Sequence, residues 1–153
     1  MGAVEDRLAM LGHEVPDVVP PVAVYVPAVQ SGRHVFTSGQ LPMRAGQLMA
    51  TGKVGAELSV DRAQELAAQC ALNAIAAIRA VIGDLERVER VVKVVCYVAS
   101  DPGFTGQPIV ANGASELLGA AFGPAGTHAR SAVGVGVLPL DAPVEVDVIV
   151  EVR

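Results

Sequence analysis

The side chain whose surroundings most clearly suggest chemistry is Arg130, near the C-terminal end of the chain. It stands in "THARSAVGVGVLP" (residues 127–139), whose alternation is typical of a β-strand. The residues on the same side as Arg130 are small: Ala132, Gly134 and Gly136. The other side presents an ordinary core face: Ala129, Ser131, Val133, Val135 and Val137. Glycine in a strand often marks the close approach of a ligand or of another backbone, and a guanidinium beside such space could bind a carboxylate through two parallel hydrogen bonds.

Glu145 lies in a segment that alternates regularly between valine and other residues, on the side away from the valines. Its carboxylate could hold and polarise a water as a general base, or could simply be the polar outer face of a strand. If the last two strands form a symmetric hairpin, Arg130 and Glu145 lie about 20 Å apart at ~3.3 Å per residue. A site that uses both side chains must then be built from two subunits. Alternatively, Arg130 forms an interface ion pair with Glu151 or Asp147.

Other polar residues give weaker signals. His128 could act as an acid or base beside Arg130, although a histidine in a loop is more often only solvated. The three histidines have no HxH or HxxxH spacing, so no metal site is expected. Cys70 and Cys96 have no CxxC spacing and are expected to be buried free thiols. The glycine-rich stretches match neither the phosphate-binding loop nor the dinucleotide fingerprint, so no cofactor is expected.

Composition excludes several classes of function. The 153 residues carry a net charge of −5 with 3% aromatic residues, which argues against a dedicated nucleic-acid binder. No apolar run approaches the ~18 residues of a membrane span, and the N-terminus lacks the pattern of a signal peptide. A cytoplasmic protein is therefore expected. Because 52% of the residues are hydrophobic, we expect part of the surface to be buried in an oligomer.

The elements that must position these residues alternate between strands and helices. Residues 1–21 are expected to form a helical arm and a proline-rich linker, and residues 22–153 a single domain. The clearest element is a helix that Ser59 caps and Gly83 ends. Strands are expected at residues 22–30, 34–40, 48–54, 90–100, 129–137 and 144–152, and a second helix at residues 108–123. This βββαβαββ order predicts an α+β fold in which two helices cover one face of a mixed sheet. The other face, carrying Arg130 and Glu145, is expected to be covered by a neighbouring subunit.

Four stretches together resemble the RidA/YjgF family of reactive-intermediate deaminases, also called the L-PSP type. They are "FTSGQLP" (residues 36–42), the alanine-rich helix, "VVKVVCYVASD" (residues 91–101) and "ARSAVGVGVLP…PVEVDVIV". The resemblance covers about residues 22–153, and the N-terminal extension is similar to that of the longer branch of the family. It implies a chorismate-mutase-like fold and a homotrimeric, barrel-like assembly with sites in the clefts between subunits.

The resemblance also implies roles for individual residues. Arg130 corresponds to the family's characteristic arginine, and Glu145 to its later glutamate. The expected substrate-binding residues are Tyr25 in the first strand, Ser38 and Gly39 in "TSGQ", Asn112 at the start of the second helix, and His128. Two positions depart from the family, because His128 stands where a proline is common and Ala132 where a cysteine is common. These departures affect the shape of the pocket and therefore the preferred substrate.

The activity that the resemblance implies is hydrolysis of reactive 2-imino or enamine acids to 2-keto acids and ammonia. Arg130 would bind the carboxylate, and Glu145 of a neighbouring subunit would align the attacking water. The expected partners are a small carboxylate-bearing imine or keto acid and two further copies of the chain, with no nucleic acid and no membrane. The alternatives are a non-catalytic trimer that binds small metabolites or a partner protein, a deaminase specialised for one pathway, and an endoribonuclease. The acidic charge and the lack of paired histidines argue against the endoribonuclease.

Overall fold

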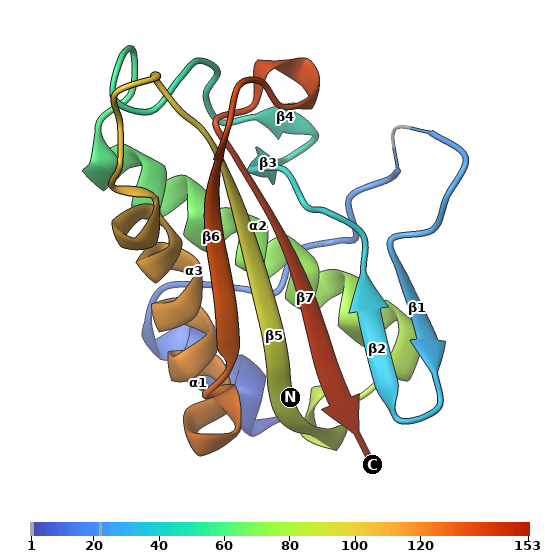
Figure 1. Ribbon diagram of the computed structural model, residues 1–153. Helices are drawn as coiled ribbons and strands as arrows, with labels where there is room; N and C mark the ends of the chain where they lie inside the picture. The colour runs from blue at the N-terminus through green and yellow to red at the C-terminus, as the bar shows by residue number, and fades with distance from the viewer. Residues whose placement is uncertain (1, 22) are drawn as a thin grey trace.

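The computed structural model describes residues 2–21 and 23–153. A five-stranded sheet of order β1-β2-β7-β5-β6 forms its centre, and helices α2 and α3 lie together on one face of that sheet (Figure 1). The strands of this sheet are β1 (Ala28–Ser31), β2 (His34–Thr37), β5 (Val88–Ala99), β6 (Ala129–Val135) and β7 (Val144–Val152). The helices are α1 (Ala3–Met10), α2 (Val60–Ile82) and α3 (Gln107–Phe122). Two short strands, β3 (Met43–Arg44) and β4 (Gln47–Leu48), pair separately, and single 3-10 turns are η1 (Leu85–Arg87), η2 (Gly123–Gly126) and η3 (Pro139–Asp141). The predicted α+β class and the single main sheet with helices are thus observed.

The core lies between the sheet and α2. The Ser59 hydroxyl accepts a hydrogen bond from the backbone N–H of Arg62, and Gly83 ends the helix with a φ of 79°, as the sequence predicts. The alternating valines of β7 are all buried: Val144, Val146, Val148, Val150 and Val152. By length and composition alone α2 could cross a membrane, but 67% of its most apolar window is buried inside the protein. Burial of this kind is typical of a core helix.

The predicted C-terminal hairpin is wrong. Strand β6 pairs with β5 in parallel, and β7 pairs with the other edge of β5 in the antiparallel sense, so β6 and β7 do not touch as neighbours. The reason lies in the helix that precedes β6. A strand, a helix and a second strand in succession form a crossover unit, which brings the two strands together in parallel.

The two faces of β6 are also the reverse of the prediction. Arg130 pairs with Val94, which belongs to the buried, helix-covered side of β5. Val133, expected in the core, is 42% exposed on the open face. Packing of α3 explains the missing side chain at Gly134, because a Cβ atom there would stand 2.8 Å from Nε2 of Gln107. Close approach of another element, not of a ligand, explains that glycine.

The N-terminal segment is helical, as predicted, and packs on α3. Val4 and Leu8 are buried, and Arg7 donates a hydrogen bond of 2.9 Å to the carbonyl of Ala121. The predicted boundary at Val22, and Met1 at the start of the arm, lie outside the described residues. Tyr25 precedes β1 rather than lying within it, and the strand expected at residues 48–54 is reduced to β4 in the small second sheet.

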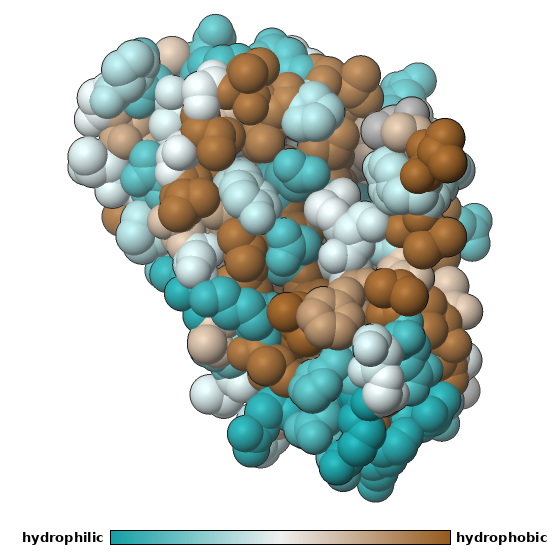
Figure 2. Space-filling model, turned by 45° about the vertical axis from the view of Figure 1, so that its right-hand side comes forward, coloured by the Kyte–Doolittle hydropathy of each residue, from teal (hydrophilic) through white to brown (hydrophobic). Residues whose placement is uncertain are grey.

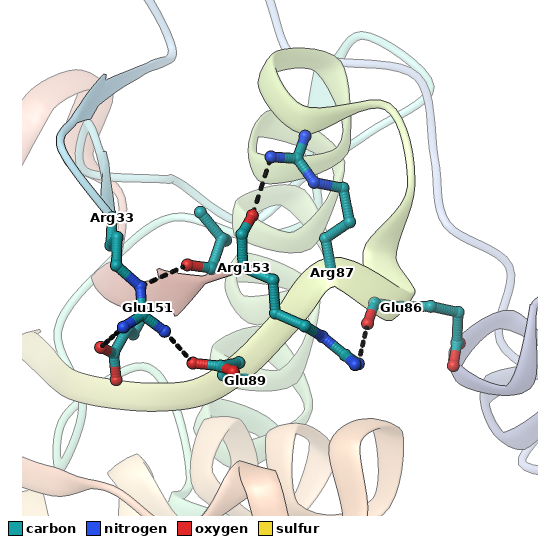
Figure 3. A network of polar contacts seen from close by, with 7 residues as sticks. Arg33, Glu86, Arg87, Glu89, Glu151 and Arg153 are labelled. Atoms are coloured by element: carbon teal, nitrogen blue, oxygen red, sulfur yellow. Dashed lines mark hydrogen bonds and ion pairs between the residues drawn. The ribbon is translucent and has the colours of Figure 1, made fainter.

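Irregularity in the main sheet is confined to one end of β5. The register between β5 and β7 shifts between Val88 and Arg90 and again between Val91 and Lys93, and is regular from Lys93 to Val98. Beside the shifted end, a network of charged side chains ties the strands together (Figure 3). In it Arg33 forms ion pairs with Glu89 and Glu151, while Arg87 and Arg153 donate to backbone carbonyls.

Candidate functional site

Arg130 is held over α3 by neutral oxygen atoms. One of its terminal nitrogens donates to Oδ1 of Asn112 at 2.8 Å and to Oγ of Ser115 at 3.2 Å, and the other donates to the carbonyl of Pro108 at 3.2 Å. None of the ion pairs found among residues 2–21 and 23–153 involves Arg130. A guanidinium has five N–H donors, so two remain outside these three bonds. Arg130 is therefore an oriented cation without a carboxylate partner in the described part of its own chain.

The alternative role of Arg130, an ion pair with Glu151 or Asp147 across a subunit interface, stays open, but within one chain neither carboxylate pairs with Arg130. Glu151 lies 3.6 Å from Arg33, measured between the charged atoms. Asp147 pairs in register with Val95 on the open face of the sheet, whereas Arg130 lies on the helix-covered face.

Asn112 and His128 lie close to Arg130, in different ways. Asn112 contacts Arg130 from the second turn of α3, which begins at Gln107, one residue before the predicted start at residue 108. His128 is one step removed: its Nε2 lies 2.8 Å from Oγ of Ser115, and its Nδ1 lies 2.6 Å from the carbonyl of Gly126. A carbonyl only accepts, so Nδ1 carries the hydrogen and donates to Gly126, while Nε2 shares a hydrogen bond with the Ser115 hydroxyl. His128 thus fixes the serine that contacts Arg130.

Glu145 is surrounded by the other predicted residues. A Cβ atom at Gly39 would stand 2.8 Å from Cδ of Glu145, so only glycine lets the carboxylate lie against this backbone. Ser38 donates from its hydroxyl to the carbonyl of Val26 at 2.6 Å, which holds the segment that carries Tyr25. Tyr25, Gly39 and Glu145 line one cavity of about 550 Å³.

The electrostatics of this half of the site favour a basic carboxylate. Burial raises the pKa of Glu145, and the nearby carboxylate of Asp147 raises it further. Burial likewise raises the pKa of Asp147, against the opposing effects of Tyr97 and Lys93. The pKa of Tyr97 is raised by burial and by Asp147. A raised pKa makes the ionised carboxylate a stronger base.

The two halves of the site are separated within one chain. Arg130 stands beside Val94 and Glu145 beside Tyr97, on the two edges of β5 and on opposite faces of the sheet. Three residues along β5 and two strand spacings place their Cα atoms about 14 Å apart. The structure therefore joins Tyr25, Ser38, Gly39 and Glu145 in one group, and Asn112, His128 and Arg130 in another. A small ligand cannot bridge the groups inside a single chain.

The cysteines and metal-binding side chains add no further chemistry. Cys70 and Cys96 are free and buried, as predicted, and burial raises the pKa of Cys96 to about 12. A thiol with such a pKa is a poor nucleophile. Over the described part of the chain, no three histidine, cysteine or acidic side chains lie close enough together to hold a metal ion.

Sequence reasoning missed Ser115 and the part of the proline-rich segment that lines the cavity, residues 16–21. A signal for the serine was present, because Asn112 and Ser115 are three residues apart and so share one face of a helix. The segment gave no comparable signal, since nothing in its local pattern indicates which part of the fold it covers.

Comparison with known proteins gives the family. The model of a family described as "YjgF/chorismate mutase-like, putative endoribonuclease" matches residues 5–152. The chain belongs to this YjgF family. The predicted resemblance is confirmed, and the match extends into the N-terminal helix.

Three YjgF-type relatives show how the similarity is distributed. Protein TCP17 of Trypanosoma cruzi is 46% identical over 99% of this chain and 96% of its own length. The crystal structure of Atu1372 from Agrobacterium tumefaciens, described as of unknown function, is 44% identical with a TM-score of 0.93, covering 99% of this chain and 94% of its own. The structure of E. coli TdcF with bound serine is 25% identical with a TM-score of 0.62, covering 90% and 92%.

Proposed function

We propose that the protein is a homotrimeric deaminase that hydrolyses 2-imino acids, and their enamine tautomers, to 2-keto acids and ammonia. The observation that carries the proposal is Arg130, an oriented guanidinium with two free N–H groups and no acidic partner among the described residues. Such a group is complementary to a carboxylate. Its counterpart is Glu145, whose raised pKa suits a general base.

The reaction needs little more than these two groups. Arg130 binds the substrate carboxylate, and Glu145 of a neighbouring subunit holds a water against the electrophilic imine carbon. As the water oxygen bonds to that carbon, the C=N π electrons move to nitrogen, and Glu145 accepts the water proton and passes it to that nitrogen. In the resulting carbinolamine the hydroxyl proton moves through Glu145 to the amino group, the C–N bond breaks, and ammonia and the keto acid leave with Glu145 ionised again. Positioning and charge stabilisation suffice because the imine is already reactive.

A cyclic assembly would bring the two halves together. The outer edge of β6, beside Arg130, pairs with no other strand of the described residues. The open face bears partly exposed apolar side chains, among them Phe36 and Val133, and Figure 2 shows apolar side chains spread over this side of the molecule with hydrophilic ones gathered at its lower end. Edge strands and exposed apolar patches are typical of subunit interfaces. Three copies related by rotation would place each Arg130 near the Glu145 of the next copy.

The serine bound by TdcF supports an amino-acid-like ligand in this family. The family description instead names an endoribonuclease. The chain's net charge of −5 is unfavourable for binding a polyanion. An RNA-cleavage assay on the same preparation separates the two activities.

The test is a competition for the imine. An amino-acid oxidase supplies a 2-imino acid, semicarbazide traps it, and the protein is expected to divert it into keto acid and ammonia. Binding of keto acids without any diversion would instead indicate the non-catalytic trimer.

Co-expression of Arg130→Ala and Glu145→Gln subunits tests the shared site. Each variant alone is expected to be inactive, and random mixing restores about a quarter of the sites in a cyclic trimer. A mixture as inactive as its parents would rule out a site built from two subunits.

A further inference from the structure

The cavity beside Glu145 has a wall that belongs to neither helix nor strand. All of residues 16–21, in the proline-rich segment, line it, together with Leu41, Met43 and Pro139. Its volume, about 550 Å³, falls within the range of about 300–1,000 Å³ that is usual for small-molecule sites. Glu145 and Gly39 also line it, so the cavity adjoins the proposed reacting centre.

Most of the polar groups that reach this cavity are already engaged. The side-chain nitrogen of Asn73 donates to the carbonyls of Leu41 and Met43, both at 3.0 Å, and its oxygen accepts from Gln69. The backbone of Gln40 forms hydrogen bonds in both directions with Val146, and its side-chain nitrogen donates to the carbonyl of Ser38. These amides hold the walls and leave few polar groups for a ligand.

The remaining charged groups of the lining are both acidic. They are Glu145, at the reacting centre, and Asp17, on the proline-rich segment. A ligand group that enters the cavity therefore meets apolar walls and negative charge. An uncharged hydrocarbon group fits these surroundings, whereas a second carboxylate would be repelled and desolvated.

The proline-rich wall is anchored at its start. Arg79, on α2, donates to the carbonyls of Val15 and Pro16 at 3.4 and 3.3 Å. The fixed φ of the prolines limits the conformations of the segment. A wall fixed in this way can discriminate between ligands by size.

We infer that this cavity receives the side chain of the imino acid and makes the enzyme selective for large apolar substrates. The inference rests on the proposed function, which places the substrate carboxylate on Arg130 of a neighbouring subunit. The preferred substrates are then 2-imino acids with branched aliphatic or aromatic side chains. Those with a methyl side chain or with a second carboxylate are poor substrates.

A matched panel of imines tests the selectivity. An amino-acid oxidase or dehydrogenase generates imines from leucine, phenylalanine, alanine and glutamate, and the semicarbazide competition gives kcat/KM for each. The imine of leucine is expected to exceed that of alanine by about tenfold or more, the usual effect of several methylene groups in an apolar pocket. Leucine and glutamate have side chains of similar length, so their comparison isolates charge. Equal values for leucine, alanine and glutamate would overturn the inference.

Substitution of one residue in the proline-rich wall tests whether the selectivity arises in this cavity. Val19→Trp adds bulk to a residue that lines the cavity, and it is expected to lower the leucine-to-alanine ratio of kcat/KM about tenfold. Val24→Trp is the matched control, because Val24 is fully exposed in the same part of the chain and does not line the cavity. It is expected to leave the ratio unchanged. A ratio that survives Val19→Trp, or that falls equally in the control, would contradict the inference.

Binding measurements separate this inference from the proposed function. Isothermal titration with 4-methyl-2-oxopentanoate, pyruvate and 2-oxoglutarate needs no turnover. If no imine is consumed but 4-methyl-2-oxopentanoate binds selectively and Val19→Trp weakens it, the deaminase is disproved and the apolar side-chain site stands. If imines are consumed without discrimination and the keto acids bind equally, the deaminase stands and the side-chain site is disproved.

Discussion

The surroundings of Arg130 and of Glu145 differ in what they do to a charged side chain. Arg130 is surrounded by neutral oxygens on α3, which orient the guanidinium without cancelling its charge. Glu145 instead lies against the bare backbone of Gly39 beside an apolar cavity, and burial raises its pKa. For Arg130 the orientation of the guanidinium matters, because its charge stays the same while it binds the substrate carboxylate. For Glu145 the basicity matters, because it must accept a proton, and desolvation increases that basicity.

The largest expected effect comes from removing the cation. Arg130→Ala is expected to lower kcat/KM for imine hydrolysis by about a hundredfold or more, because it removes one partner of a charged hydrogen-bonded pair. Arg130→Lys keeps the charge but loses the two-pronged geometry, so an intermediate loss is expected. Steady-state kinetics on both variants provides the measurement. If Arg130→Ala kept the kcat/KM of the wild type, the guanidinium of Arg130 would have no part in the reaction.

Removing the basic carboxylate is expected to act on a different parameter. Glu145→Gln should lower kcat by about a hundredfold, the lower end of the usual effect of a general base. KM should change little, because the amide keeps the shape of the side chain and Arg130 still binds the substrate. A variant that loses affinity but keeps kcat would show that Glu145 binds substrate rather than activating water.

The contact that positions Glu145 can be tested without touching the carboxylate. Gly39→Ala places a methyl group where the Glu145 side chain lies, and an activity loss of about tenfold is expected from the displaced base. Gly136→Ala is the matched control, because nothing lies within 4 Å of a Cβ atom there. Equal activity of the two variants would mean that the close approach of Gly39 to Glu145 has no bearing on catalysis.

The smallest expected effect is on stability. Burial raises the pKa of Glu145 in the folded protein above its usual value of 4.5, so the folded state binds the proton more tightly than the unfolded state. Above pH 4.5 the folded state therefore holds more protons, and the free energy of unfolding falls as the pH rises through the folded pKa. Denaturant titrations between pH 4 and pH 8 should show a smaller fall in Glu145→Gln than in the wild type. An identical fall in both would mean that Glu145 is not measurably desolvated.

The sequence predicted the parts of the fold that rest on local pattern. The alternation of β7 identified its buried face, and Ser59 and Gly83 marked the ends of α2. Alternation does not say which strand lies beside which, and the expected hairpin failed for that reason. The helix between β5 and β6 was the better guide, since it requires a parallel crossover.

The candidate site was only partly predictable. Arg130 and Glu145 were recognised from motifs. The face of the sheet on which Arg130 lies was not predicted, because small residues beside an arginine leave room for a ligand and for a packed helix equally well. The face is set by Gln107, which is distant in the sequence and packs over Gly134. The group around Arg130 also needed Ser115, whose contacts depend on how α3 lies against β6. Such contacts follow from tertiary packing rather than from spacing along the chain.

The register shifts at the start of β5 have a consequence for how the chain can change in evolution. From Lys93 to Val98, β5 pairs regularly with the strand that carries Arg130 on one side and the strand that carries Glu145 on the other. One inserted residue there would reverse the faces of both partners at once. The bulged end, between Val88 and Lys93, already absorbs extra residues without disturbing that stretch. Insertions and deletions in sequences that descend from this one should therefore occur at the bulged end of β5 and be absent from the stretch between Lys93 and Val98.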